Sequence, residues 1–289
     1  MLNSLFMIPY SKFVFFGTPI FARLVLEELV AANMLPVAVV CNPDRPAGRH
    51  RVITPPDIKK YILEKSLSIE ILQPEDPSQI TEHLSQMAPD FFVVAAYGKV
   101  LKKNILDIPR LGTIGIHSSL LPKYRGTSPI HGAIMAGETE TGATLFVMDD
   151  KMDHGPILVE HKVPIMQNDT HETLFPKIWS GGGKMLAKIL PDFLDGKIKP
   201  IVQDETKATY TKKFTSADGF IEPQDLEEAL NGDEKKAIAA DRKIRAFSVE
   251  PGVWTLKDGK RMKLLEAELK DGKLILKTIQ NEGQKPIKV

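Results

Sequence analysis

Cysteine is nearly absent from this sequence, since Cys41 is the only one among 289 residues. A single cysteine cannot form a disulfide within the chain, and it excludes a metal site built from several cysteine ligands. This composition favours a reducing compartment. The apolar start, residues 1–10, has no basic beginning and no small-residue cleavage site, and it is too short to span a membrane. We therefore expect a cytoplasmic protein without a membrane segment or an export signal.

The glycine patterns of nucleotide-binding loops are also missing. The first apolar run ends in Gly-Thr-Pro at residues 17–19, where a dinucleotide-binding fold requires Gly-x-Gly-x-x-Gly. Residues 180–184, Ser-Gly-Gly-Gly-Lys, lack both the first glycine of a phosphate loop and the Ser or Thr that follows its lysine. The missing Gly-x-Gly-x-x-Gly pattern disfavours a nicotinamide cofactor. Because residues 181–183 lie in a helical pattern, where each glycine costs up to about 1 kcal/mol relative to alanine, we expect a kink or close packing there.

Neither sign of charge is in large excess, and the formal net charge is +1. No overall field therefore draws the chain to nucleic acid or to a membrane. From residue 207 onward, 17 basic side chains stand against 14 acidic ones, a modest positive excess that an ordinary solvated surface also explains. With 43% hydrophobic residues, the chain is long enough for about two domains.

Apolar strand-like runs alternate with helical patterns through the first 200 residues. We expect helices at residues 21–32, 56–65, 77–87, 128–136 and 170–194, and strands at 13–16, 37–41, 69–72, 91–95, 113–117, 142–148 and 157–163. This alternation predicts an α/β domain with a doubly wound, mostly parallel, Rossmann-like sheet. In such sheets ligands bind outside the carboxyl ends of the strands.

The pattern changes after residue 200. Short alternating runs are separated by Asp-Gly at residues 258–259 and 271–272, a strong signal for β-hairpins. We expect a small β-barrel with helical pieces at residues 226–230 and 237–245. The predicted organisation is a catalytic domain at 1–200, a linker at 201–210 and a second domain at 211–289.

An acid/base pair is the first candidate for chemistry. His117 ends a predicted strand, and Asp153 lies in a later loop that also contains His154, which we interpret as a bystander. Imidazole transfers protons near neutral pH, and a nearby carboxylate can hold its charge and accept a proton. The alternatives are a satisfied core histidine, a turn carboxylate next to Gly155, and a zinc site from the three side chains, for which no repeated ligand spacing exists.

The residues around this pair resemble a known family. Residues 114–126 (Ile-Gly-Ile-His-Ser-Ser-Leu-Leu-Pro-Lys-Tyr-Arg-Gly) and 152–155 (Met-Asp-His-Gly) are similar to the signature of the folate-dependent formyltransferases. Residues 16–22 resemble the family's opening turn. Residues 43–49 resemble a loop of the members that act on methionyl-tRNA, and residues 210–213 and 244–255 resemble their second domain. The resemblance extends over roughly residues 12–288.

The resemblance implies formyl transfer from 10-formyltetrahydrofolate to the α-amino group of initiator methionyl-tRNA, without a metal. His117 would stabilise the developing oxyanion, and Asp153 would orient His117 and take the amine proton. The folate would contact an apolar strand with its flexible turn, a second wall, and a loop that closes over the pterin. The expected contacts are Ala96, Tyr97 and Gly98 in the turn, Ser119, Leu120, Leu121 and Pro122 in the wall, and Asp149 and Gly155 in the loop. The alternative for these segments is an ordinary core strand with its turn.

The same resemblance assigns a tRNA-binding role to Arg45, Arg49 and Arg51 in a loop rich in proline and glycine. Arginine there would contact phosphates and base edges of the acceptor stem, whereas the alternative is a solvated charge run. The second domain would be an oligonucleotide-binding-like (OB-like) barrel that adds salt-sensitive contacts to the tRNA backbone. We expect a monomer.

One position departs from the family pattern. The family has Asn-x-His where this chain has Gly115 before His117, and that asparagine helps hold the oxygen of the formyl group. Losing one oxyanion donor typically lowers turnover by about 10²–10³. Either another group replaces the donor (a water, a backbone N–H or a hydroxyl such as that of Ser118), or the chain acts on another amine, as a sugar-amine N-formyltransferase would, or it is a slow or noncatalytic tRNA- or folate-binding homologue.

Overall fold

The structure is a computed structural model that describes residues 11–48 and 50–289. The expectations for residues 1–10 and for Arg49 lie outside the described residues. The chain forms two compact units. The first contains the described residues up to Lys123 together with Gly142–Lys162 and Pro176–Ala208, and the second contains Tyr124–Thr141, Val163–Phe175 and Thr209–Val289. The predicted boundaries at 200 and 211 stay a prediction.

The first unit is centred on a seven-stranded sheet in the order β10-β9-β7-β6-β1-β2-β5. Five neighbouring strands are parallel, and β9 runs antiparallel to β7. The predicted mostly parallel sheet is therefore confirmed. The strands are β1 (Phe13–Phe16), β2 (Ala38–Val40), β5 (Glu70–Leu72), β6 (Phe91–Ala95), β7 (Thr113–His117), β9 (Glu140–Val147) and β10 (Ile157–Pro164).

Helices cover this sheet because its inner strands are apolar on both faces. All four residues of β1 are buried, and α1 buries Ala22, Val25, Leu26 and Leu29, the spacing of one helical face. A core on one side of the sheet joins β1, β2 and β6 to side chains of α3 and α4. The helices of this unit are α1 (Ile20–Ala31), α2 (Asp57–Glu64), the 3₁₀ turn η1 (Pro77–Ile80), α3 (Thr81–Gln86), α4 (Lys103–Leu106) and most of α6 (His171–Leu194).

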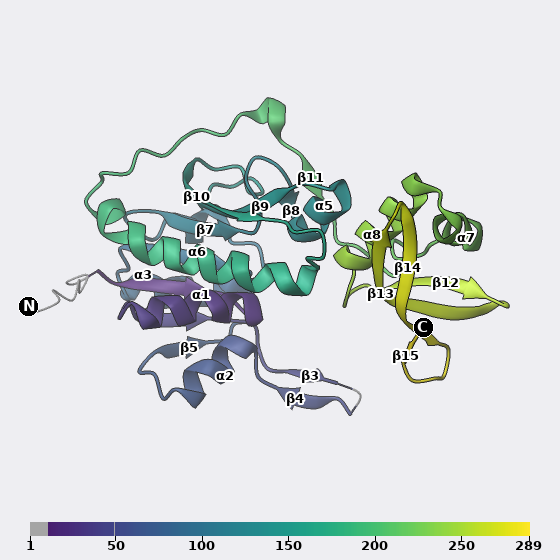
Figure 1. Ribbon diagram of the computed structural model, residues 1–289. Helices are drawn as coiled ribbons and strands as arrows, with labels where there is room; N and C mark the ends of the chain where they lie inside the picture. Colours follow the sequence, from purple (N-terminus) through teal and green to yellow (C-terminus); the bar gives the residue numbers. More distant parts are fainter. Residues whose placement is uncertain (1–10, 49) are drawn as a thin grey trace, which may run out of the picture. The chain divides into compact units, whose positions relative to one another are not determined.

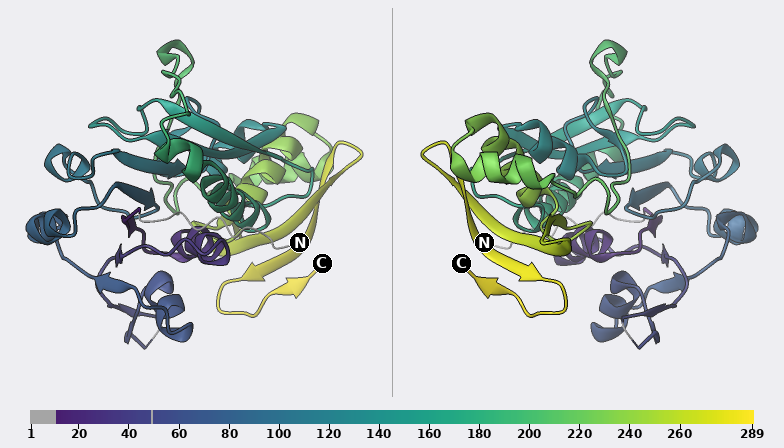
Figure 2. Two further views of the ribbon diagram at one scale, coloured as in Figure 1. Left: turned by 90° about the vertical axis from the view of Figure 1, so that its left-hand side faces the viewer. Right: turned by 90° about the vertical axis from the view of Figure 1, so that its right-hand side faces the viewer.

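The three glycines of α6 permit close packing, one of the two outcomes expected from the sequence. A Cβ at Gly181 would lie 2.2 Å from Nε2 of His161, and one at Gly183 would lie 3.1 Å from Cα of Val25 in α1. The helices α1 and α6 lie side by side on one face of the sheet (Figure 1, Figure 2). The glycines are therefore explained by contact, which offsets their low helix propensity.

The second unit contains a four-stranded antiparallel sheet, β12 (Val253–Lys257), β13 (Lys260–Lys270), β14 (Lys273–Asn281) and β15 (Ile287–Lys288). Both predicted Asp-Gly hairpins are present, and all four turn residues have positive φ, as type I′ turns require. Helix α8 (Glu234–Ala246) packs on β13 and β14, beside α7 (Pro223–Asn231) and α5 (Pro129–Ala136). Two short strands, β8 (Arg125–Gly126) and β11 (Tyr210–Thr211), pair in parallel. The small β domain is confirmed, whereas closure into an OB-like barrel stays a prediction.

Two segments differ from their expected form. The arginine-rich segment, expected to be a loop, forms the hairpin β3 (Arg45–Ala47) and β4 (Val52–Thr54), which extends from the sheet in Figure 1. The segment expected to be an extended linker contains the 3₁₀ turn η2 (Glu205–Lys207), capped by Asp204. Within residues 11–48 and 50–289, no helix is long and apolar enough to cross a membrane.

Candidate active site

The strand β7 places His117 at its carboxyl end, at the sheet edge where ligands bind in this class of fold. His117 is 7% exposed, and its partner across the sheet is Thr144 of β9. Nδ1 of His117 lies 3.6 Å from Oδ2 of Asp153. This separation is longer than a hydrogen bond, and catalytic contacts are often long without substrate. The structure thus brings together two residues 36 positions apart.

The loop that carries Asp153 is held in one shape by its backbone contacts. Asp153 has φ +50°, a left-handed conformation that aspartate tolerates better than most residues. Nε2 of Gln203 donates hydrogen bonds to the carbonyl oxygens of Asp153 (2.9 Å) and Gly155 (2.8 Å). A Cβ at Gly155 would lie 1.7 Å from the carbonyl oxygen of Val147, so only glycine fits there. Asp153 therefore faces His117 from a fixed loop.

His154 contributes to the shape of this loop, and its interpretation as a bystander to the chemistry stays a prediction. Its Nδ1 lies 2.6 Å from Oδ2 of Asp149, and its Nε2 lies 3.6 Å from Oε1 of Glu205. The other carboxylate oxygen of Asp149 accepts a hydrogen bond from the backbone N–H of Lys151 at 3.0 Å. The carboxylate of Asp149, a predicted folate contact, thus shapes the loop.

Gly115 lies two residues before His117, on the same face of β7, and is directly opposite Phe146 of β9. A Cβ at this glycine would lie 2.6 Å from Cε1 and 2.7 Å from Cζ of Phe146, and 2.9 Å from Cγ of Met148. Real Cβ atoms do not approach other atoms this closely. The aromatic ring and the methionine therefore fill the space in which an asparagine side chain would begin.

The segment Ser119–Pro122, predicted to form a wall of the folate site, is held by hydrogen bonds to β9, the strand that pairs with β7. Oγ1 of Thr144 donates to the carbonyl oxygen of Ser119 (2.7 Å) and accepts from the N–H of Leu121 (3.1 Å). Oγ of Ser119 donates to the carbonyl oxygen of Lys123 at 2.6 Å. Leu121 is buried, and Leu120 and Pro122 are partly exposed. Ser118, the hydroxyl considered as a replacement donor, is 6% exposed.

The turn after β6, predicted to bind the folate, buries the ring of Tyr97 and leaves the backbone at Gly98 open. The ring of Tyr97 is 2% exposed, packs edge-on against Phe16 and has a hydroxyl without a hydrogen-bond partner, and burial raises the pKa of Tyr97 to about 12. Its carbonyl oxygen accepts from Oγ1 of Thr18 (3.2 Å) and Nδ2 of Asn42 (3.4 Å). Ala96 and Gly98 have positive φ, and no atom lies within 3.8 Å of a Cβ built on Gly98. This turn therefore offers backbone, not an aromatic ring, to a ligand.

The predicted tRNA-binding arginines belong to the β3–β4 hairpin. Arg45 is exposed and forms an ion pair with Glu75, and Arg51 is exposed in the turn with φ +51°. Val52 and Ile53 of the same hairpin are 62% and 63% exposed. The hairpin therefore presents both cations and apolar side chains to solvent.

Several residues that shape the site were not predicted from the sequence. Phe146, Thr144 and Gln203 carry no catalytic signature, and only the strand register and the path of the chain after α6 bring them here. A metal centre gains no support from the donors, because the described residues contain no group of three or more His, Cys, Asp or Glu placed to hold a metal ion.

Comparisons with known proteins identify the family of this chain. The formyl transferase family matches residues 11–190, and the family of formyl transferase C-terminal domains matches residues 231–278. Methionyl-tRNA formyltransferase from Listeria innocua is 39% identical over 265 residues, which cover 91% of this chain and 81% of the relative. The chain belongs to the formyl transferase family.

Two further relatives extend this result. Methionyl-tRNA formyltransferase from Chloroflexus aurantiacus is 40% identical over 259 residues, which cover 89% of this chain and 79% of that relative. The crystal structure of an N-formyltransferase from Helicobacter canadensis, in complex with folinic acid and dTDP-3-aminofucose, superposes with a TM-score of 0.64. Its sequence is 19% identical, with 91% of this chain and 89% of that chain covered, so this likeness concerns the fold alone.

Proposed function

We propose that this formyltransferase moves the formyl group of 10-formyltetrahydrofolate to the α-amino group of methionyl initiator tRNA. The observation that carries the proposal is the convergence of His117 and Asp153 at the carboxyl end of β7. This convergence occurs in a chain 39–40% identical to methionyl-tRNA formyltransferases over about 90% of its length. The N-formyltransferase whose structure contains dTDP-3-aminofucose is 19% identical, against 39–40% for the methionyl-tRNA formyltransferases, so a sugar amine is the weaker candidate for the acceptor.

His117 and Asp153 act together in this reaction, because Asp153 orients the imidazole that binds the oxyanion and also carries the proton. The amine attacks the formyl carbon, the carbonyl oxygen gains negative charge, and the bond from the formyl carbon to the folate nitrogen then breaks. An N–H of His117 stabilises the oxyanion, because a buried imidazole donor acts in a site with little water. Asp153 faces His117, takes the proton of the attacking amine and returns it to the folate nitrogen as that nitrogen leaves.

The backbone around the pair suits a flat folate. The pterin edge carries amide-like donors and acceptors, which pair with main-chain groups. The backbone at Gly98 is open to such pairing, the side-chain oxygen of Asn42 lies nearby without a hydrogen-bond partner, and the Ser119–Pro122 segment is held in place by Thr144. In this proposal Asp149 and Gly155 shape the loop beside the pterin, and Tyr97 contributes its main chain.

The β3–β4 hairpin is the proposed contact with the acceptor stem. Arg45, Arg51 and, from the sequence, Arg49 supply positive charge for phosphates, and the exposed Val52 and Ile53 supply apolar surface. The residues from 207 onward, in which 17 basic side chains stand against 14 acidic ones, add contacts to the tRNA backbone. We also propose that the protein acts as a cytoplasmic monomer.

An acceptor panel tests the function. The protein is incubated with 10-formyltetrahydrofolate and, separately, methionyl initiator tRNA, methionyl elongator tRNA and a dTDP-amino sugar, and the formylated products are separated by mass. We expect formylmethionyl initiator tRNA as the main product. Formylation of the sugar in preference to the tRNA would contradict the proposed acceptor. No product from any acceptor, with tRNA affinity retained, would identify a noncatalytic binding protein.

A further inference from the structure

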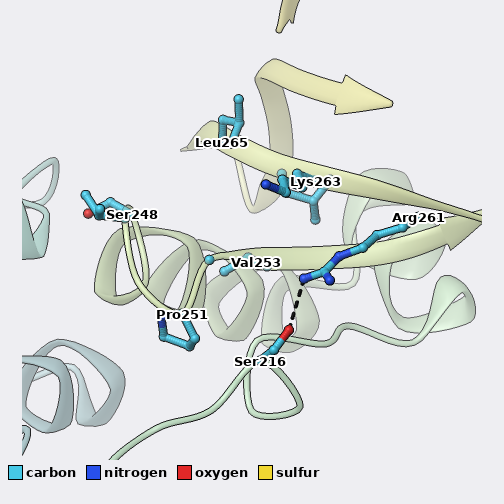
Figure 3. A pocket seen from close by; sticks show the side chains of 10 residues that line it. Ser216, Ser248, Pro251, Val253, Arg261, Lys263 and Leu265 are labelled. Atoms are coloured by element: carbon cyan, nitrogen blue, oxygen red, sulfur yellow. Dashed lines mark hydrogen bonds between the residues drawn. The ribbon is translucent and has the colours of Figure 1, made fainter. Parts of the chain in front are cut away.

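The second unit contains a cavity of about 330 Å³ beside its antiparallel sheet, and none of its lining residues belongs to the formyl-transfer site. Figure 3 shows Arg261, Lys263 and Leu265 of β13 on one side. Val253 of β12 and loops that contain Ser216, Ser248 and Pro251 also line it. A volume of this size is at the lower end for small-molecule sites, which begin at about 300 Å³.

The lining is positively charged. Its ten residues include Arg261, Lys263 and two serines, but no aspartate or glutamate. Nη2 of Arg261 donates a hydrogen bond to Oγ of Ser216 at 3.0 Å. Nε of Arg261 and Oγ of Ser248 are both buried and have no hydrogen-bond partner. Buried donors without partners are rare in folded proteins, so these two atoms leave unsatisfied polar capacity next to the cavity.

The guanidinium group of Arg261 is held in place before any ligand arrives. Its central carbon lies 4.3 Å from the centroid of the Trp254 ring, and Nε1 of Trp254 donates to the carbonyl oxygen of Ser216 at 2.8 Å. A planar guanidinium fixed in this way presents its N–H groups as a fork that matches phosphate oxygens. Pro251, Val253 and Leu265 provide apolar surface next to it, which suits the carbon skeleton of a sugar.

We propose that this cavity binds the phosphate ester of a nucleotide, with Arg261 and Lys263 on the phosphate and the apolar side chains against the ribose. The cavity is too large for a phosphate alone, and it combines fixed cations with apolar surface. The ester has two conceivable sources, a backbone position of the tRNA or a free nucleotide. The tRNA source rests on the proposed function, whereas the free nucleotide does not.

Trp254 provides the assay, because it stacks on Arg261 and is one of only two tryptophans. In a Trp179→Phe background, the remaining tryptophan fluorescence is followed during titration with ribose 5-phosphate and with ribose as the matched control ligand. We expect a saturable change with ribose 5-phosphate only. Arg261→Ala should weaken this binding at least about tenfold, since charge-assisted hydrogen bonds are lost. Lys260→Ala, an exposed lysine on the same strand outside the cavity, should leave it unchanged.

Two further variants separate binding from folding. Lys263 is exposed, so Lys263→Ala should weaken binding without altering thermal unfolding. Arg261→Lys keeps the charge but removes Nε and the planar fork, and it should bind several-fold more weakly than the parent. If ribose 5-phosphate produces no saturable change, or if Lys260→Ala weakens binding as much as Lys263→Ala, the proposed site is wrong.

A titration with uncharged initiator tRNA distinguishes the two sources. A tRNA backbone position predicts that Arg261→Ala weakens tRNA binding and lowers its salt dependence by about one ion, and that ribose 5-phosphate competes with the tRNA. A free nucleotide predicts unchanged tRNA binding with loss of ribose 5-phosphate binding. Ribose 5-phosphate binding without any formyl transfer would refute the proposed function and keep the cavity, whereas normal formyl transfer without such binding would refute the cavity alone.

Discussion

Gly115→Asn restores the family residue, and the structure predicts that this change alone harms the protein. The new Cβ would lie 2.6–2.9 Å from atoms of Phe146 and Met148, which must move. Overpacking of a close-packed core costs about 1–3 kcal/mol. For a chain of this size that cost lowers the melting temperature by about 2–10 °C. Without a place for its amide, the asparagine should not increase the turnover of formyl transfer.

Phe146→Leu is the matched partner change, because it removes the ring atoms that the new side chain would meet. In this background, Gly115→Asn should cost less stability than in the parent, with a coupling of about 0.5–3 kcal/mol between the two sites. Turnover should then rise above that of Phe146→Leu alone, because an added oxyanion donor is typically worth about 10²–10³. Gly115→Ala is the control that adds Cβ without the amide.

Thermal unfolding and single-turnover formyl transfer with methionyl initiator tRNA measure both effects in the five proteins. A stable Gly115→Asn protein that is faster than the parent while Phe146 is intact would refute the reasoning. Additive losses in the double variant would also refute it, since they would show that the ring and the new side chain do not compete for one space.

Three further predictions concern the loop, the second unit and the hairpin. Gln203→Leu removes the donor to two loop carbonyls, so it should cost about 1–3 kcal/mol of stability and lower turnover by displacing Asp153; an unchanged turnover would contradict this. Burial lowers the pKa of His171 from 6.5 to about 4, so between these pH values the unfolded chain binds one proton more than the folded chain. The free energy of unfolding should therefore fall by at most about 3 kcal/mol as the pH is lowered from 6.5 to 4. Urea unfolding of His171→Phe should show a smaller loss, with the rest due to the buried His131, whose pKa is also lowered; an equal loss would assign it elsewhere. Arg51→Ala should weaken tRNA binding and reduce its salt slope by about one without changing the KM for the folate; an equal loss for the folate would mean that the hairpin only supports the fold.

The alternation of apolar runs and helical patterns was sufficient to predict the sheet and the long helix. Strands such as β1 are short apolar runs closed by turn residues, and this signal is local. The Asp-Gly hairpins of the second unit could also be predicted, because their turn signal is local. The β3–β4 hairpin was missed because Pro46 lies within β3, and proline within a run argues against a strand.

Only part of the site could be predicted from the sequence, because its contacts join residues that are far apart along the chain. The ring opposite Gly115 follows from the register that pairs it with Phe146, and register depends on the folded sheet. Gln203 reaches the loop of Asp153 from 50 residues away. The ring of Tyr97 turned out to be core, because a tyrosine beside a ligand-binding turn and a buried tyrosine give the same sequence pattern.

The central claim is that His117 and Asp153 act as one unit on the formyl group. The most direct measurement is the single-turnover rate of formyl transfer to methionyl initiator tRNA for His117→Ala, Asp153→Asn and the double variant, all at saturating folate. We predict that each single change lowers the rate by at least about 10² and that the double variant is little slower than the slower single one, because residues that act together are non-additive. A rate near that of the parent in either single variant, or losses that multiply in the double one, would contradict the claim.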